Sequence, residues 1–509
     1  MTASGPQVIR GGRVLDIRGH RADRADILLD GGRIAEIGPP GLAAPAGATE
    51  AAEAAEAGEI DATDRLLIPG LVNAHTHGHG SLGKGLGDRW TLELLLNAGP
   101  WITGQRSLDD KHLAAKLNAA EMVLKGCTAA YDLYFEFPVP TADGMRAVAD
   151  GYAEVGARAV IAPMMADRSL FEAVPGLMDA LPDDLRAGVA AVRLSPAERH
   201  LEACRALLAT WPHDRDRLRL DLAPTIPLHC SDGFITGCRD LAAEFSVGLH
   251  MHLAESKAQA VSATARYGKS LTAHLDALGF LGPDFTAAHC VWLDDDDMAR
   301  LADAGCKVAH NPGSNLRLGS GIAPARGMRD RGLAVGIGTD GSNCADNQNM
   351  FAAMRFAAFV SRVDSPDYAT WLETAEVIEM ATAGSAECLG MADRIGRLAP
   401  GYFADIVFLD LANVNFVPFN DPTNQLVMSE EGSAVTDVMI GGRLVLQDRR
   451  FTTIDYDRLR ADAAAAVERL KGATADAKRL SERLEDVVGQ FCIGLARRPH
   501  HIHRLIGAV

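Results

Sequence analysis

The sequence predicts an α/β protein: a (β/α)8 TIM barrel with a small composite β-sandwich domain and a helical C-terminal tail. Three observations lead to this fold class. Eight apolar, strand-like segments alternate with helical patterns through the middle of the 509-residue chain. Short strand patterns separated by glycine pairs occur near both ends of the chain. The residues from 453 onward are rich in helix-forming types.

The small β domain is expected to combine residues 1–66 with residues 396–452. Gly11-Gly12, Gly31-Gly32 and Gly441-Gly442 each stand between two short apolar runs, which is a hairpin signal. Neither piece is large enough to bury a core alone, so the two pieces are expected to share one. Residues 39–59 are of low complexity and rich in Ala, Glu, Gly and Pro, and they are expected to form an exposed loop.

Residues 67–395 are expected to form the barrel. Continuous apolar runs are typical of parallel strands that are buried on both faces. Eight β/α units over this length indicate that the strands close on themselves. The expected strands are 67–75, 127–134, 157–164, 218–223, 247–252, 285–290, 307–310 and 333–339, and clear helical patterns cover 108–125, 232–246, 258–278 and 294–304.

Composition and charge narrow the class of protein. The net charge of -17 argues against a nucleic-acid partner and against binding to an anionic membrane. There is no signal-peptide pattern at residues 1–6 and no apolar run long enough to span a membrane. Nine cysteines without a Cys-x-x-Cys pair indicate reduced, mostly buried thiols. We therefore expect a cytoplasmic protein, and the apolar helices of the 453–509 extension favour a homodimer or higher homo-oligomer.

Side chains that bind metals stand at the ends of the expected strands. His75 and His77 end the first strand, and side chains two residues apart on a strand point to the same side. Both imidazoles can therefore meet one ion such as Zn²⁺. Because catalytic groups of a barrel lie at the C-terminal ends of its strands, the sequence predicts a metal site there. The later strand ends carry His250, His252 and Glu255, then His289, His310 and Asp340.

These strand ends resemble motifs of the amidohydrolase superfamily. More narrowly, they are similar to its triazine-hydrolase and heterocycle-deaminase branch, which includes chlorohydrolases and guanine, 8-oxoguanine, cytosine and S-adenosylhomocysteine deaminases. The resemblance covers about residues 7 to 450 in the same order and spacing, including the run Gly396–Val407. The matching motifs are Pro69-Gly70-Leu71-Val72-Asn73-Ala74-His75-Thr76-His77, His252-Leu253-Ala254-Glu255, Ala288-His289, His310-Asn311-Pro312-Gly313-Ser314-Asn315 and Gly338-Thr339-Asp340.

The resemblance implies a role for each residue of the expected site. One divalent metal ion, Zn²⁺ in the first place with Fe²⁺, Co²⁺ or Mn²⁺ as alternatives, would lower the pKa of a bound water. Asp340 would accept the proton of that water, and Glu255 would protonate a ring nitrogen of the substrate. His289 would polarise the substituent of the attacked carbon or orient the hydroxide. The implied metal ligands are His75, His77, His252 and Asp340.

Two further positions bear on the metal site. Spacing alone does not choose between His250 and His252, whereas the His-x-x-Glu pattern of the family chooses His252 and leaves His250 as a packed or supporting imidazole. Binuclear members of the superfamily carry a carboxylated lysine at the end of the fourth strand. The corresponding run, Leu220–Ser231, has no lysine. One metal ion is therefore expected, and dihydroorotase-like or hydantoinase-like chemistry is disfavoured.

The loops that follow the strands are expected to contact the substrate. Thr225 stands where adenosine-type deaminases of the branch typically have His, which counts against an adenosine-like substrate, and His229 lies four residues further on. The identities of the residues just past the second and third strands favour a flat, partly apolar ligand over a sugar-bearing one. The candidate substrate contacts are His79, Trp90, Trp101, Glu136, Met164, Thr225, His310 and Asn315.

These expectations favour a metal-dependent hydrolase that deaminates an amino-substituted N-heterocycle and releases ammonia. The heterocycle would be an aminopyrimidine, a purine or a triazine-like ring. Thr225 and the glycine-rich loop after the first strand motivate an alternative, in which the same residues hydrolyse an amide, urea, carbamate or aryl chloride. A non-catalytic ligand-binding barrel is a third possibility, against which the complete set of metal-binding and acid–base residues weighs.

Overall fold

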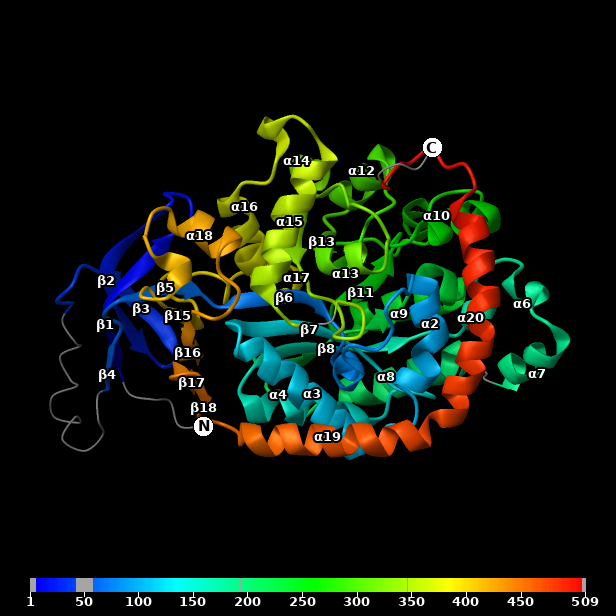
Figure 1. Cartoon of the computed structure of the whole chain (residues 1–509), viewed down its shortest axis with the longest axis horizontal. Helices are drawn as coiled ribbons and strands as arrows, with labels where there is room; N and C mark the ends of the chain where they lie inside the picture. Colours follow the sequence, from blue (N-terminus) through cyan, green and yellow to red (C-terminus); the bar gives the residue numbers. More distant parts are fainter. Residues whose placement is uncertain (1–5, 43–57, 192–193, 346, 506–509) are drawn as a thin grey trace.

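The computed structural model describes residues 6–42, 58–191, 194–345 and 347–505. Most of the expected 39–59 loop therefore lies outside the described residues. A mostly antiparallel sheet occupies one end of the molecule, and parallel strands surrounded by helices make up the rest (Figure 1). The fold is α/β with parallel sheets, as predicted, and its largest apolar core lies between those strands and the helices around them.

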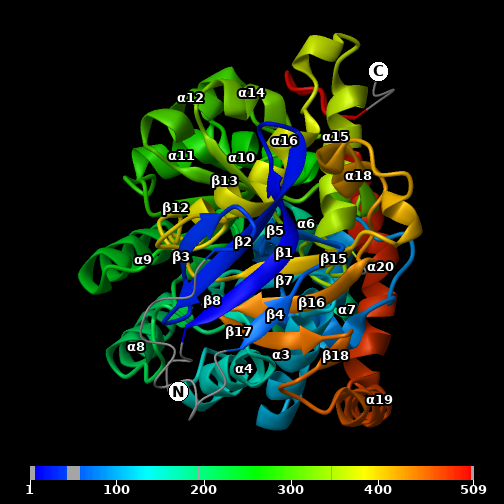
Figure 2. The same cartoon turned by 90° about the vertical axis from the view of Figure 1, so that its left-hand side faces the viewer.

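A nine-stranded sheet combines strands from both parts of the chain, and Figure 2 shows the blue N-terminal strands beside the orange later ones. The strand order among the described residues is β18-β17-β16-β15-β5-β1-β2-β3, and β4 pairs with β1. The strands are β1 Gln7–Asp16, β2 Arg21–Asp30, β3 Arg33–Gly38, β4 Glu59–Asp61, β5 Arg65–Pro69, β15 Ile406–Asp410, β16 Val435–Ile440, β17 Arg443–Gln447 and β18 Arg450–Phe451.

Two of the three glycine pairs form hairpin turns. Gly31-Gly32 connects β2 with β3, and Gly441-Gly442 connects β16 with β17, with all four residues at positive φ. The prediction of a hairpin at Gly11-Gly12 was wrong, because β1 continues through this pair with a shift in register. The backbone N–H of Gly11 donates to Oδ1 of Asp26 at 2.9 Å. A side-chain acceptor thus replaces the ladder partner, and the pair forms a bulge instead of a turn.

The parallel strands form two sheets, in the orders β10-β8-β7-β6, with β9 beside β8, and β11-β12-β13-β14. Backbone hydrogen bonds connect the two sheets at both edges. The N–H of Leu222 donates to Gly248 O at 3.0 Å, and the N–H of Asp340 donates to His75 O at 2.9 Å. The strands are β6 Leu71–Thr76, β7 Cys127–Phe135, β8 Arg158–Met165, β9 Leu218–Leu220, β10 Ala223–Pro224, β11 Leu249–Leu253, β12 Phe285–His289, β13 Lys307–His310 and β14 Ala334–Ile337.

The expected strand 67–75 is divided at Gly70. β5 pairs antiparallel with β15 in the nine-stranded sheet, whereas β6 pairs parallel with β7. A Cβ atom on Gly70 would lie 2.3 Å from Oγ1 of Thr128, so glycine is required where the chain passes from one sheet to the other. The expected helix 258–278 is also divided, because Gly268 ends α10 in a left-handed conformation and Ser270 caps the start of α11.

Helices follow most of the parallel strands and cover them from outside (Figure 1). The longer ones are α2 Leu92–Ile102, α3 Leu108–Val123, α4 Ala142–Val155, α7 Asp183–Ala191, α8 Ala197–Ala209, α9 Asp232–Phe245, α10 Lys257–Tyr267, α12 Asp295–Asp303, α15 Met350–Asp364, α19 Tyr456–Ala473 and α20 Ala475–Ala496. The shorter ones are α5 Leu170–Ala173, α6 Leu177–Ala180, α11 Leu271–Ala277, α13 Pro312–Arg317, α14 Ala325–Asp330, α16 Thr374–Glu379, α17 Ser385–Cys388 and α18 Pro422–Met428.

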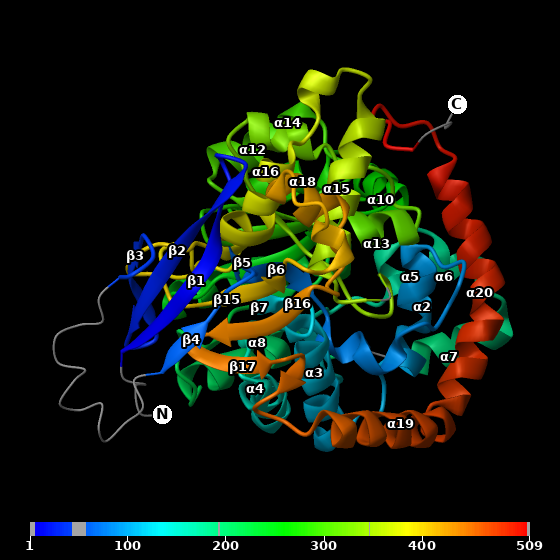
Figure 3. The same ribbon diagram turned by 60° about the vertical axis from the view of Figure 1, so that its left-hand side comes forward.

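The helical extension runs along the outside of the molecule. In Figures 1 and 3, α19 crosses below the parallel strands, and α20 turns upward beside α2. In the part of the chain that the structure describes, every helix is too short or too polar to cross a membrane. The nine cysteines are free and buried, as predicted.

Candidate metal centre and active site

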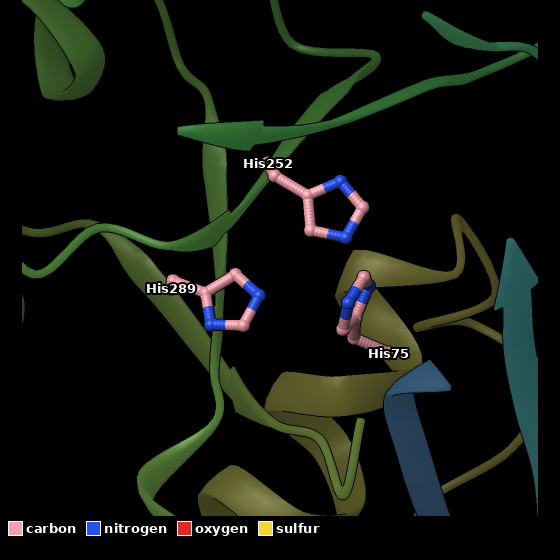
Figure 4. Close-up of side chains that lie close together, drawn as sticks. All are labelled: His75, His252 and His289. Atoms are coloured by element: carbon pink, nitrogen blue, oxygen red, sulfur yellow. The ribbon is translucent and has the colours of Figure 1, made fainter. Parts of the chain in front are cut away.

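Imidazole and carboxylate side chains from separate strands converge at the C-terminal ends of β6, β11, β12 and β14. Figure 4 shows the rings of His75, His252 and His289 directed toward a common space. Nε2 of His77 lies 3.2 Å from Oδ1 of Asp340, and Nε2 of His75 lies 3.6 Å from the same oxygen. All of these side chains are buried, as are the strands that carry them. Rigid backbone therefore fixes the positions of the donor atoms.

The hydrogen bonds of two rings show which of their nitrogens are free. Nδ1 of His77 lies 2.8 Å from Leu133 O, and Nδ1 of His252 lies 2.7 Å from Thr225 O. A carbonyl oxygen only accepts, so each Nδ1 carries the proton and each neutral ring presents a lone pair on Nε2. These two Nε2 atoms lie 3.1 Å apart. Two facing lone pairs at this distance repel each other unless a cation lies between or beside them.

Other buried atoms at the same place also lack partners. Nε2 of His75, Nε2 of His289 and Oε2 of Glu255 are buried and accept or donate no hydrogen bond. Unpaired buried polar atoms are costly, and their number at one point indicates a missing ligand. The donor atoms of His75, His77 and Asp340 all lie within 4.8 Å of one another, and so do those of His75, His252 and His289. This donor set fits one divalent ion.

For His77, burial lowers the pKa but the hydrogen bond and charge of Asp340 outweigh it, so its pKa is raised. Burial favours the uncharged form of the other imidazoles. It lowers the pKa of His252 to about 3, with the neighbouring His77 adding to the effect. It also lowers the pKa of His75 and His289, in both cases as the largest cause. A neutral imidazole is the form that binds a metal ion, so His75, His252 and His289 are ready to do so near neutral pH.

Three residues of the site have left-handed backbone. Ala254, His289 and Asp340 have φ values of 50°, 68° and 60°, a region that residues other than glycine rarely adopt. Each lies at or just beyond the end of a parallel strand. Oδ1 of Asp340 accepts the N–H of Gly341 at 2.7 Å, which holds the carboxylate at this sharp turn. Backbone strain of this kind is concentrated at functional sites.

Supporting side chains orient the rings from behind. Nδ1 of His75 lies 3.2 Å from Nε2 of His250, so His250 contacts a candidate ligand without facing the common space itself. Nδ1 of His289 lies 2.9 Å from Oδ1 of Asn315 and donates its proton to that oxygen. Nε2 of His289 is thereby left free to face Glu255. Such partners fix both the orientation and the tautomer of an imidazole.

Glu255 lies beside His289 and Asp340. Its Oε2 is 3.6 Å from Nε2 of His289, and its backbone N–H donates to Oε1 of Gln259 at 2.8 Å. Burial raises the pKa of Glu255 well above its usual value, and the charges of Asp340 and Glu93 raise it further. The carboxyl group is therefore held in its protonated form over a wider pH range than an exposed glutamate. A protonated carboxyl in an enclosed site can donate a proton to a ligand.

A cavity of about 450 Å³ opens onto these residues, with His77, His252, Glu255 and Asp340 in its wall. Three predicted substrate contacts, His79, Met164 and Thr225, line it, and His229 lines it too. Nδ1 of His79 accepts the N–H of Phe135 at 3.1 Å, which turns the ring toward the cavity side of η1 Gly78–Gly83. This volume is typical of a site for a small organic ligand.

Five predicted contacts lie outside the described lining of the cavity. Glu136 forms an ion pair with Lys111 and accepts hydrogen bonds from Thr141 at the start of α4. Trp90 and Trp101 pack edge to face, with ring centroids 6.1 Å apart. The other two are His310, which is buried, and Asn315, which contacts His289.

The far wall of the cavity was not predicted from the sequence. Leu92, Leu95 and Leu96 of α2 contribute to it, as do Leu480 and Leu484 of α20. The apolar spacing of the α20 residues was visible in the sequence. Their partner is α2, which lies far earlier in the chain: Asn97 of α2 and Ser481 of α20, which are hydrogen-bonded, are 384 residues apart. Pattern within one helix does not identify so distant a partner.

A family model described as the amidohydrolase family matches residues 66–445. The chain belongs to this family. The 5-methylthioadenosine/S-adenosylhomocysteine deaminase of Syntrophobacter fumaroxidans is 33% identical over 451 residues, which are 87% of this chain and 93% of that protein. This amidohydrolase also resembles solved structures of related proteins.

Several of these structures contain zinc. An adenosine deaminase from Xanthomonas campestris with bound zinc has a TM-score of 0.79 and 27% identity, covering 92% of this chain and 99% of its own. A variant of the atrazine chlorohydrolase of Arthrobacter aurescens, in complex with zinc and atraton, has a TM-score of 0.79 and 28% identity, covering 90% and 99%. The amidohydrolase described here is a hydrolase that uses one divalent metal ion, which confirms those predictions.

Proposed function

We propose that this amidohydrolase removes the amino group of an amino-substituted N-heterocycle as ammonia, at the site formed by Glu255, His289 and Asp340. The arrangement of these three side chains carries the proposal, because their ligand atoms lie within 4.8 Å of one another. A proton donor, an orienting imidazole and a proton acceptor thus surround a single reacting carbon. The proposed metal ligands are His75, His77, His252 and Asp340.

The reaction requires water to add to the amino-bearing carbon. When bound, a divalent ion lowers the pKa of water and so makes hydroxide available near neutral pH. Oδ1 of Asp340 faces His75 and His77, which leaves Oδ2, 3.8 Å from Nε2 of His289, to accept the proton of the water. His289 orients the attacking oxygen through Nε2, because its Nδ1 is bonded to Asn315.

Glu255 completes the proton transfers. Its protonated carboxyl donates to the ring nitrogen next to the attacked carbon as the new C–O bond forms. The proton held by Asp340 then passes to the amino group, the C–N bond breaks, and ammonia leaves. Glu255 recovers its proton from the hydroxyl group of the adduct, so both carboxyl groups return to their starting states.

Related proteins support the choice of leaving group. The relative from Syntrophobacter fumaroxidans and the structure from Xanthomonas campestris are both named as deaminases of adenosine compounds. Thr225 was expected to count against an adenosine-like substrate, yet it lines the cavity with His229 beside it. An aminopurine is therefore the first heterocycle to test, followed by aminopyrimidines and triazines.

The experiment is an ammonia-release screen on the zinc-loaded protein, with metal content measured on the same sample. We expect about one equivalent of zinc and ammonia from at least one aminopurine, aminopyrimidine or triazine. The matched control is Glu255→Gln, which keeps the size of the side chain and removes the acid. Absence of ammonia from every compound, with zinc bound, would rule out the proposal.

A second candidate is hydrolysis of a different bond at the same carbon. The structural likeness to an atrazine chlorohydrolase supports it, since that enzyme is named for a chloride leaving group. The same screen separates the two reactions when chloride and amines are measured beside ammonia. Release of chloride or an amine without ammonia would favour this candidate.

The proposal extends to the architecture and assembly of the protein. We propose that residues 67–395 close into one (β/α)8 barrel, with the small β domain from 1–66 and 396–452 and the extension 453–509 outside it. The hydrogen bonds at both edges of the parallel sheets support closure. We also propose a cytoplasmic homodimer or higher oligomer, which the exposed Phe356, Phe359 and Val363 of α15 support. Light scattering on the purified protein tests the oligomeric state.

A further inference from the structure

The part of the cavity away from the candidate metal ligands has an apolar wall. Leu95 and Leu96 come from α2, Phe171 comes from α5, and Leu480 and Leu484 come from α20 (Figure 3 shows α2 and α20 side by side). Phe137, a residue that is 50% exposed, also belongs to the lining. An apolar substituent of a ligand binds favourably against such a wall, because its surface is removed from water.

Charged groups are almost absent from the same wall. Among the described residues of the lining, Arg168 is the one that carries a formal charge apart from Glu255 and Asp340 at the reacting end. Its Nη1 donates to Cys230 O at 3.3 Å. A ligand ammonium group in this half of the cavity would meet no carboxylate, and burying it unpaired would be costly.

α20 is held firmly enough to act as part of this wall. Nδ2 of Asn97 on α2 donates to Ser481 O on α20 at 2.9 Å. Further along α20, Leu484 and Val488 pack into a separate apolar core with Leu170 and Leu177. These contacts hold α20 against α2 and so position this part of the wall.

The helix that completes the wall lies outside the part of the chain that the family model matches. That match ends at residue 445, whereas α20 runs from Ala475 to Ala496. The residues of the reacting end, His75 to Asp340, lie inside the match. The reacting end thus lies wholly inside the match, whereas the distal wall combines α2 and α5, which lie inside it, with α20, which lies outside it.

We infer that α2, α5 and α20 form an apolar subsite that selects heterocycles with an uncharged, apolar substituent and disfavours those with a zwitterionic one. The inference rests on the proposed function for the position of the heterocycle at the reacting end. The two substrates in the name of the relative form a matched pair for the test. 5′-Methylthioadenosine and S-adenosylhomocysteine share adenine, ribose and sulfur, and they differ in a methyl group against an amino-acid chain.

Binding is measured by titration calorimetry on zinc-loaded Glu255→Gln protein, so that turnover does not enter the result. We expect the methylthio compound to bind at least about tenfold more tightly than S-adenosylhomocysteine. Leu484→Ala should reduce this ratio severalfold. Val488→Ala is the matched control, because it shortens a buried side chain on the same helix outside the cavity lining, and it should leave the ratio unchanged.

A gain-of-function variant guards against misfolding as an explanation. Leu480→Glu places a carboxylate in the wall and should shift the ratio toward S-adenosylhomocysteine, whose ammonium group then has a partner. Equal or tighter binding of S-adenosylhomocysteine by the parent, binding of neither compound, or an equal effect of Leu484→Ala and Val488→Ala would each overturn the inference. Failure of the proposed function would be a different result: the unsubstituted enzyme would release no ammonia, whatever the ratio of the two binding constants.

Discussion

A buried ion pair connects the two kinds of sheet in this protein and gives a sharp prediction of stability. Arg158 begins β8 of the parallel sheet, and Asp405 immediately precedes β15 of the nine-stranded sheet. Nε of Arg158 lies 2.9 Å from Oδ2 of Asp405, and Nη2 lies 3.3 Å from Oδ1. Their side chains are 4% and 1% exposed. The two-point contact excludes water from both charges.

Arg158→Met removes the cation but nearly keeps the volume of the side chain. The carboxylate of Asp405 then remains buried with the N–H of Gly441, at 2.7 Å from Oδ1, as a remaining donor. The stacking of the guanidinium over Phe403, 4.0 Å from the ring centre, is lost as well. Leaving one partner of such a pair uncompensated costs about 3–5 kcal/mol. This is a large share of a typical stability of about 5–15 kcal/mol.

Urea unfolding, followed by circular dichroism on metal-loaded protein, measures this loss of free energy. The double variant Arg158→Met with Asp405→Leu should recover most of it, because it leaves no buried charge. Asp216→Ala is the control: its backbone oxygen accepts from Nη1 of Arg158 at 2.9 Å, and that contact survives the change of side chain. This variant loses the partly exposed ion pair with Arg394, which should cost less than about 1 kcal/mol. A loss below about 1 kcal/mol for the single variant would refute the reasoning.

Further predictions concern the site and the strand that leads into it. Glu255→Gln should lower kcat by about 10²- to 10⁴-fold with zinc content unchanged, and loss of zinc would instead make Glu255 a ligand. Burial raises the pKa of Glu255, and its protonated form is the one that donates, so kcat/KM should fall as the pH rises through that raised pKa. The same fall of kcat/KM at high pH in Glu255→Gln would contradict this assignment. Chelation of the metal should lower the melting temperature, since the buried donor atoms lose their partner, and zinc should restore it. Gly70→Ala should destabilise the protein by about 1–3 kcal/mol. Thr128→Ala in the same chain should relieve only part of that cost in thermal unfolding, because Cβ of residue 128 would still lie 2.9 Å from the added Cβ.

The sequence was sufficient for the order of strands and helices and for the residues that converge at the strand ends. Strands of a parallel sheet appear in the sequence as continuous apolar runs. A residue that directly follows such a run must lie at the end of the strand, because the chain is continuous. The breaks could not be predicted in this way. The division at Gly70 depends on Thr128, which belongs to a neighbouring strand, and the bulge at Gly11 depends on Asp26 across the sheet.

The candidate substrate contacts show the same limit. His79, Met164 and Thr225 line the cavity because they lie close to the ends of their strands. Glu136 lies equally close to the end of β7, but Lys111 and Thr141 engage its carboxylate. Proximity to a strand end is visible in the sequence, whereas competition by neighbours from other helices is not.

The position of α20 has a consequence for how the molecule is made. All the donor atoms near Asp340 are already present in the chain before residues 475–496 have been synthesised. The chamber beside them stays open to water until α20 docks against α2, and closing so long a loop costs entropy that only the docked apolar contacts repay. We expect a nascent chain to acquire its zinc-binding residues first and to enclose its substrate chamber last.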